Sequence, residues 1–205
     1  MIKGDTPVMH GSHVRVISFM QHTIFPNNII RFWMQHVNDW LEKPQDLDKL
    51  IQADYEHLVT LARKSVFLSW EYEWEGCFAL IILLSALPRN LYRDSLRAYV
   101  SDKKAISLAK KMCKRGWDHY LSNNEKIGIY LPFIHYEDLE KLEEQMPRIQ
   151  QTQHGLFIAM AQDRLDQLQK FGRFPHRNDI LGRRSTPEEQ DYLRILYTHK
   201  KGGHS

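Results

Sequence analysis

The hydrophobic residues of this chain recur with the period of an α-helix over most of its length. Between Asp46 and Lys64 they form one stripe, made of Leu47, Leu50, Ile51, Tyr55, Leu58, Val59 and Ala62. A shorter stripe begins after Asp102, which we expect to cap its helix, and ends before Gly116. No segment alternates apolar and polar residues between turns, as half-buried strands do. The pattern therefore predicts an all-α protein.

Prolines and glycines mark the predicted helix ends. We expect one helix over Pro147–Lys170, with Pro147 in its first turn and Gly172 after its end. Pro88 predicts the end of a helix over Glu73–Leu87, because proline lacks the N–H that an interior position needs. Thr186 to Glu189 have the form of a capping box that opens the last helix. Further helices are predicted at Asn28–Leu41, Ser95–Val100, Glu125–Tyr130 and Tyr136–Gln145.

Helices of this length joined by short loops predict a single domain of antiparallel helix pairs, stacked as helical hairpins. We place this domain at residues 25–197. Residues 1–24 are expected to be an N-terminal tail, and the polar, glycine-rich residues 198–205 a flexible C-terminal tail. No internal repeat of fixed period stands out, and the oligomeric state is left open.

Composition and charge limit the kinds of partner that the sequence predicts. The net charge of +3 is too small to indicate nucleic-acid binding. The longest apolar stretch, Gly76 to Leu87, has 12 residues, whereas a membrane span needs about 20, so we expect a helix buried on all sides. Cys77 and Cys113 are the only cysteines and have no metal or disulfide spacing. These features, with no convincing signal peptide, predict a cytoplasmic protein without nucleic acid or membrane partners.

Three polar segments interrupted by proline stand out as candidate functional loops: Leu87–Arg93, Leu131–Asp138 and Phe171–Glu189. Guanidinium groups bind carboxylates and phosphates through two parallel hydrogen bonds. We therefore expect a candidate anion site, with a small anionic ligand or an acidic peptide as partner, at Arg89, Arg93, Arg173, Arg177 and Arg183. The alternative is that these arginines pair with the chain's own acids and lock the loops, with partners at Asp102, Glu137, Asp138 and Glu188.

The same segments resemble the bacterial domain-of-unknown-function 924 family. The matching motifs are Phe32-Trp33, Pro88–Arg93, Leu131–Phe133 with His135, Glu137 and Asp138, and Phe171 to Glu189. The resemblance implies an all-helical fold similar to tetratricopeptide-repeat superhelices, and it implies no activity. This chain reads Leu84-Ser85-Ala86-Leu87 where the family usually reads Leu-Asp-Gln-Phe, it has Tyr136 where the family usually has Ser, and Asp163-Arg164 stands where a histidine is common.

Histidine titrates near neutral pH, so His135 and His176 are candidate catalytic acids or bases, with Glu137 as an orienting carboxylate. Hydrogen-bonded structural histidines are the alternative. His135, Glu137 and His176 do not have a known metal-ligand spacing. The chain also has no phosphate-binding loop, dinucleotide motif or nucleophile elbow. We therefore expect no metal and no cofactor.

Three hypotheses remain open from the sequence. The first is a binding protein with an Arg/His-lined pocket for a small anion or an acidic peptide group. The second is a hydrolase or transferase that uses His135 or His176 as acid or base, with Arg89 and Arg173 holding the oxyanion. The third is a protein-interaction scaffold without a ligand pocket.

Overall fold

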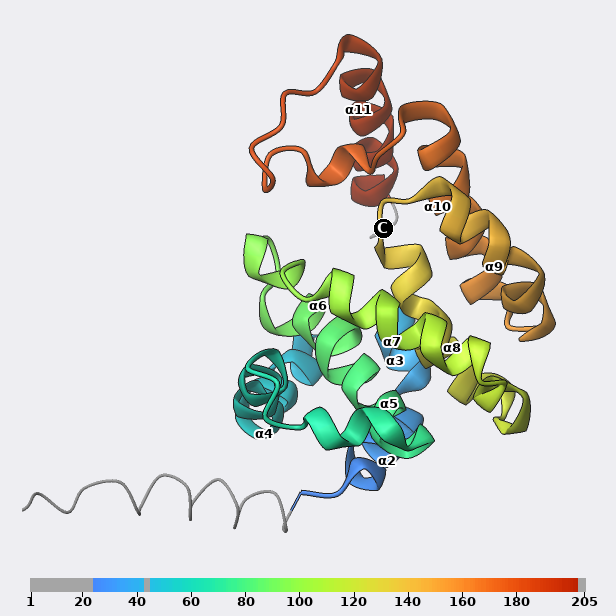
Figure 1. Ribbon diagram of the computed structural model, residues 1–205. Helices are drawn as coiled ribbons and strands as arrows, with labels where there is room; N and C mark the ends of the chain where they lie inside the picture. Colours follow the sequence, from blue (N-terminus) through green and yellow to red (C-terminus); the bar gives the residue numbers. More distant parts are fainter. Residues whose placement is uncertain (1–23, 43–44, 203–205) are drawn as a thin grey trace, which may run out of the picture.

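The computed structural model describes residues 24–42 and 45–202, which fold as helices with no strand among them (Figure 1). The all-α prediction is therefore confirmed. The α-helices are α2 (Pro26–Gln35), α3 (Val37–Glu42), α4 (Gln45–Arg63), α5 (Trp74–Ile81), α6 (Leu87–Leu91), α7 (Asp102–Lys114), α8 (Asn123–His135), α9 (Leu139–Gln151), α10 (Gly155–Phe171) and α11 (Pro187–Gly202). Shorter helical turns are η1 (Leu68–Tyr72), η2 (Ile82–Ala86), η3 (Leu96–Ala98), η4 (Trp117–Tyr120) and η5 (Pro175–Arg177).

The core of the molecule is built around one helical run, Trp74–Leu91, that joins α5, η2 and α6. It packs against α2, α4, α7 and α8. Every residue from Gly76 to Pro88 is buried, as predicted for the long apolar stretch. By length and composition alone this run could cross a membrane, but 78% of it is buried inside the fold, as in the core helix of a globular protein.

Pro88 does not end this helix, contrary to the prediction. The preceding turn, η2, is a π-helix, in which the N–H of Leu87 donates to the carbonyl of Ile82. The chain then re-enters α-geometry with Pro88 in the first turn of α6, a position that needs no N–H donor. The wider turn therefore lets the helix pass the proline and carry Arg89 and Asn90 beyond it.

The predicted helix over Pro147–Lys170 is also wrong, because two helices divide this segment. Pro147 lies inside α9, and the break comes at Thr152–His154. There Gln153 adopts a left-handed backbone with φ of 56°, and the His154 side chain accepts a hydrogen bond from the N–H of Phe157 to cap α10. The cap is a histidine, so the usual cap residues gave no signal in the sequence.

Other predicted boundaries shift. Ser101, not Asp102, is the N-cap of α7, and the predicted helix Asn28–Leu41 is divided into α2 and α3. The predicted Ser95–Val100 helix is the short turn η3. The helix α8 is longer than predicted and passes through Pro132, whereas α9 begins at Leu139. The Thr186 capping box of α11 is confirmed by hydrogen bonds in both directions between Thr186 and Glu189.

The predicted tails fall largely outside the described residues, which exclude 1–23 and 203–205. At the C-terminal end, α11 runs to Gly202 and so extends past the predicted boundary at 197.

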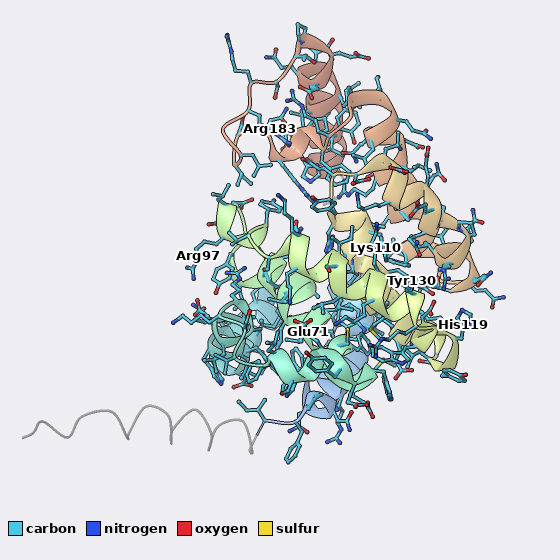
Figure 2. All side chains as sticks on the ribbon, viewed as in Figure 1. Glu71, Arg97, Lys110, His119, Tyr130 and Arg183 are labelled. Carbon is cyan, nitrogen blue, oxygen red and sulfur yellow. The ribbon has the colours of Figure 1, made fainter. Side chains whose placement is uncertain are left out.

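Helices that follow one another in the chain pack together, α7 on α8, α8 on α9 and α9 on α10. In Figure 1, α9, α10 and α11 form the upper part of the molecule, above the core helices. The segment between α10 and α11 holds Arg183, which Figure 2 shows in this upper part, far from Glu71 on the lower helices. The cavity described next lies between the α6 end of the core and this C-terminal part.

Candidate functional site

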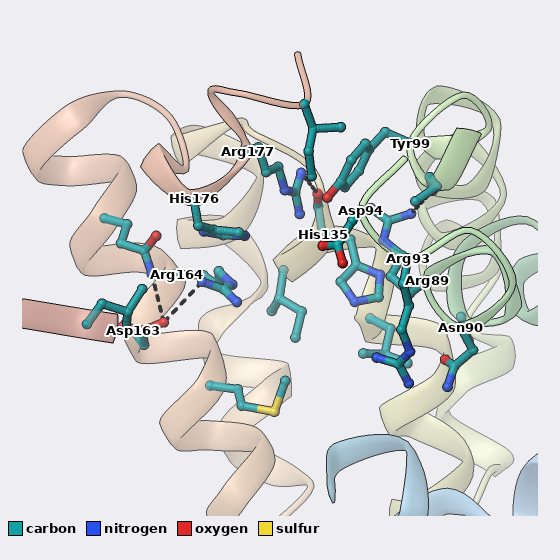
Figure 3. Close-up of a pocket in the computed structure, with 18 of the residues that line it drawn as sticks. Arg89, Asn90, Arg93, Asp94, Tyr99, His135, Asp163, Arg164, His176 and Arg177 are labelled. Carbon is teal, nitrogen blue, oxygen red and sulfur yellow. Dashed lines mark hydrogen bonds and ion pairs between the residues drawn. The ribbon is translucent and has the colours of Figure 1, made fainter. Parts of the chain in front are cut away.

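A cavity of about 490 Å³ lies where α6 and η3 face α10, η5 and α11. In Figure 3 the side chains of α10 and η5 stand on one side, those of the α6 and η3 region on the other, and His135 lies between them. The cationic and imidazole side chains that line this pocket are Arg89, Arg93, His135, Arg164, His176 and Arg177. Three of the five arginines predicted for an anion site and both predicted histidines are therefore brought to one cavity.

Arg173 and Arg183 lie outside the pocket and lock the loop between α10 and α11. Arg173 binds Glu189 through Nε at 2.6 Å and Nη2 at 2.8 Å. Arg183 binds Glu137 through Nη1 at 2.6 Å and Nη2 at 2.9 Å. For these two residues the alternative prediction, that the arginines pair with acids of the same chain, is correct. We call them the locking arginines. Arg173 pairs with Glu189 rather than with the expected Glu188.

The locking arginines lower the pKa values of the two carboxylates that bind them. The hydrogen bond from Arg173 lowers the pKa of Glu189 to about 2, and bonds from the Thr186 N–H and from Asn178 act in the same direction. Burial alone would raise the pKa of Glu137, but hydrogen bonds from Arg183 and from the Phe174 N–H bring it below its usual range. Glu137 is therefore an acceptor within the loop, and it is not among the residues that line the pocket.

Arg89 and Arg93 line the pocket but are already paired. Arg89 makes a two-fold contact with Asp102, at 2.5 and 2.7 Å, and also donates to the carbonyl of Ala98. Arg93 binds Asp48 at 2.5 and 2.8 Å. Asp102 thus has its carboxylate on Arg89 rather than at the end of α7. Both guanidiniums therefore border the cavity while their positive charges are paired with the carboxylates of Asp102 and Asp48.

Arg177 differs from the other arginines. It is 6% exposed, and its guanidinium lies over the rings of Tyr99 and Phe174, at 4.7 and 4.5 Å from their centroids. Its Nη1 donates to the carbonyl of His135 at 2.7 Å, and it forms no ion pair with any described residue. Burial, assisted by the nearby charge of Arg89, lowers its pKa to about 10. It is a buried cation that makes no direct ion pair with a described carboxylate, and the charges of Asp102 and Glu137 only partly offset the lowering of its pKa.

His135 is held by a residue that the sequence did not single out as a partner. Its Nδ1 lies 2.9 Å from the hydroxyl oxygen of Ser85, which is 1% exposed and sits on the π-helical turn η2. His176 projects from η5 with its ring stacked at 5.9 Å on Phe174, on the opposite side of the pocket.

The sequence also missed several lining residues. Met160, Asp163, Arg164 and Gln167 all line the pocket from α10. Their spacing of three or four residues is that of one helix face, which is the signal that could have revealed them. Arg164 binds Asp163 at 3.2 Å, and burial lowers the pKa of its guanidinium. Tyr99 and Asp94, which follow α6, were missed because loop residues have no periodic signal.

Burial raises the pKa of Cys77 and of Cys113 to about 12, so neither thiol is a thiolate nucleophile at neutral pH. Among residues 24–42 and 45–202 no group of three or more His, Cys, Asp or Glu side chains is placed to hold a metal ion.

Comparison with known proteins places the chain in a family. A family model described as bacterial protein of unknown function (DUF924) matches residues 29–195. A solved structure of a protein of unknown function, ATU0120 from Agrobacterium tumefaciens, is similar with 32% sequence identity and a TM-score of 0.77, covering 82% of this chain and 96% of that one. A search of curated proteins gave no match. The chain thus belongs to the DUF924 family of bacterial proteins of unknown function.

Proposed function

We propose that this protein binds a small anionic ligand in the pocket between α6 and α10. The observation that supports this most directly is the presence of four guanidiniums and two imidazoles, from separate segments of the chain, around one cavity of about 490 Å³. Small-molecule sites have volumes of roughly 300–1,000 Å³ and a few polar groups that converge on the ligand. We further propose that it acts in the cytoplasm, as a binding protein.

Arg177 gives the site its preference for an anion. An unpaired buried cation is costly to hold in a protein interior, since its solvation is lost without a compensating charge. A carboxylate or phosphate oxygen beside Arg177 would supply that charge. Its Nη2 donates to no described residue, so this end of the guanidinium can donate to a ligand.

The test is ligand-induced thermal stabilisation of the full chain. A ligand that binds only the folded state raises the melting temperature in proportion to the logarithm of its concentration over Kd. We expect at least one anion from a panel of phosphate, monocarboxylates and dicarboxylates to raise it. Arg177→Gln should remove most of this shift, whereas Arg173→Gln, outside the pocket, should retain it relative to its own unliganded protein. If no anion shifts the wild type, or if both variants respond alike, the proposal is wrong.

A second candidate function, acid–base catalysis by a hydrolase or transferase, is favoured by the contact between Ser85 and His135. A hydrogen bond at Nδ1 fixes the orientation of the imidazole ring, as in catalytic histidines, although a hydroxyl can donate or accept and therefore does not select the tautomer. Ser85 is almost fully buried, so it would position His135 rather than attack a substrate. Turnover of ester or phosphate-ester substrates that disappears in His135→Gln, and whose pH profile shifts in Ser85→Ala, would support this function. An absence of turnover in the wild type would leave binding alone.

A further inference from the structure

The ion pairs around the pocket restrict the charge that a ligand can have. Arg89, Arg93 and Arg164 each contact a carboxylate, at 2.5, 2.5 and 3.2 Å, so their charges are balanced before a ligand arrives. Arg177 has no such described partner. Of the lining carboxylates, Asp94 makes no hydrogen bond or ion pair with any described residue. Apart from its histidines, the pocket therefore has one arginine, Arg177, and one carboxylate, Asp94, that make no ion pair with a described residue, although the charges of Asp102 and Glu137 also act on Arg177.

A ligand with two or more negative charges does not fit this balance. The first charge would be matched by Arg177, but a second would face a site with no spare cation and the carboxylate of Asp94. Two negative charges at one site repel each other. A nucleotide or an inorganic phosphate dianion is therefore disfavoured relative to a monoanion.

The lining also includes an apolar part. Leu131 and Ile134 of α8 line the pocket, as do Met160 of α10, Ile180 and Leu196. A water molecule takes about 30 Å³ of liquid volume, so an inorganic anion would fill only a small part of 490 Å³. An apolar body placed against these side chains would be removed from water, which is favourable in proportion to the area buried.

We propose that the pocket accepts a small amphipathic molecule with one carboxylate-type negative charge and an apolar body. The charged end would lie at Arg177, and the body would lie against Met160, Ile180 and Leu196. This inference rests on the proposed function, which requires only that some small anion binds. It adds the charge and the shape of that anion.

Titration calorimetry with matched ligands tests the charge and the apolar body separately. Octanoate is the monoanion, suberate is a dianion of the same chain length, and octanol is the uncharged analogue. We expect octanoate to bind at least tenfold more tightly than suberate or octanol. Shortening octanoate should weaken binding about fourfold per methylene, the value for one buried CH₂ group. Equal affinity for octanoate and acetate would overturn the apolar part of the inference.

Asp94→Asn tests the charge balance in the protein itself. Asp94 is exposed and has a left-handed backbone with φ of 54°, a conformation that asparagine tolerates well, so the change removes a charge without straining the chain. Suberate should gain at least threefold more affinity than octanoate in this variant. An equal change for both ligands would contradict the role given to Asp94.

The two proposals fail in different ways. If phosphate, suberate or ATP binds the wild type and octanoate does not, the inference about charge and shape is wrong, and the proposed anion site stands. If none of these anions binds, the proposed function itself fails. Binding of octanol as tight as that of octanoate would overturn the placement of a negative charge at Arg177.

Discussion

The two sides of the loop between α10 and α11 use the same residue type for different purposes. On the outer side, Arg173 and Arg183 each face a carboxylate that takes two of their hydrogen bonds. On the inner side, Arg177 is sandwiched between two aromatic rings with a carbonyl as its hydrogen-bond partner. The arginine-rich motif is therefore not one site: the locking arginines hold the loop in place, and of the three arginines only Arg177 lines the pocket.

The largest effect that separates the two sides is expected on ligand binding. Arg177→Gln should weaken binding of octanoate by about 10- to 150-fold, because a charge-assisted hydrogen bond contributes roughly 1.5–3 kcal/mol. Arg183→Gln should leave the Kd of the folded protein within about threefold, since Arg183 binds Glu137 outside the pocket. Calorimetric titration of both variants measures this. Equal losses would show that the loop acts as one unit.

The stability of the fold, in contrast, should depend on the outer side of the loop. Glu137→Ala removes the acceptor of two bonds from Arg183 and one from the Phe174 N–H, and it leaves the half-buried guanidinium unpaired. We expect the free energy of unfolding to fall by about 2 kcal/mol, as for other hydrogen bonds to charged groups. Urea denaturation gives the value. Recovery of most of it in Glu137→Gln, which keeps an acceptor oxygen, would indicate that packing and hydrogen bonding, rather than the charge of Glu137, dominate.

A smaller effect is expected at the cap of α11, at the end of the same loop. Thr186→Ala removes the hydroxyl that accepts from the Glu189 N–H, and caps of this kind contribute about 1 kcal/mol. Ser122→Ala, at the capping box of α8, is the matched control. Both should lower stability similarly in denaturation experiments without changing ligand affinity. A loss of affinity in Thr186→Ala alone would link the outer side of the loop to the pocket.

The effect of acid is the hardest of these to resolve, because it adds to the titration of all other carboxylates. The folded pKa of Glu189, about 2, lies below the usual value near 4.5. Its contribution to stability is therefore full above about pH 4.5 and is lost as the pH falls toward 2. Glu189→Gln, which cannot titrate, should lose less stability than the wild type over this interval. Parallel curves would contradict the role of the Arg173–Glu189 pair.

By itself, the sequence determined the helical fold, because a stripe of period 3.6 with a buried apolar run at its centre leaves no other way to cover the hydrophobic side chains. It also located the segments that supply Arg89, His135, His176 and Arg177. Tertiary structure decided which of these residues meet. The π-helical turn carried the chain past Pro88, and Gln153 broke the helix that Pro147 had been expected to begin.

Only the packing of α10 against the core added Arg164 to the pocket, and only the fold assigned Glu137 and Glu189 to the locking arginines. The physical reason is that helix formation depends on contacts within a few residues. Whether a guanidinium meets a carboxylate or an open cavity depends on residues that are distant in the chain, such as Asp48 and Arg93, which are 45 positions apart.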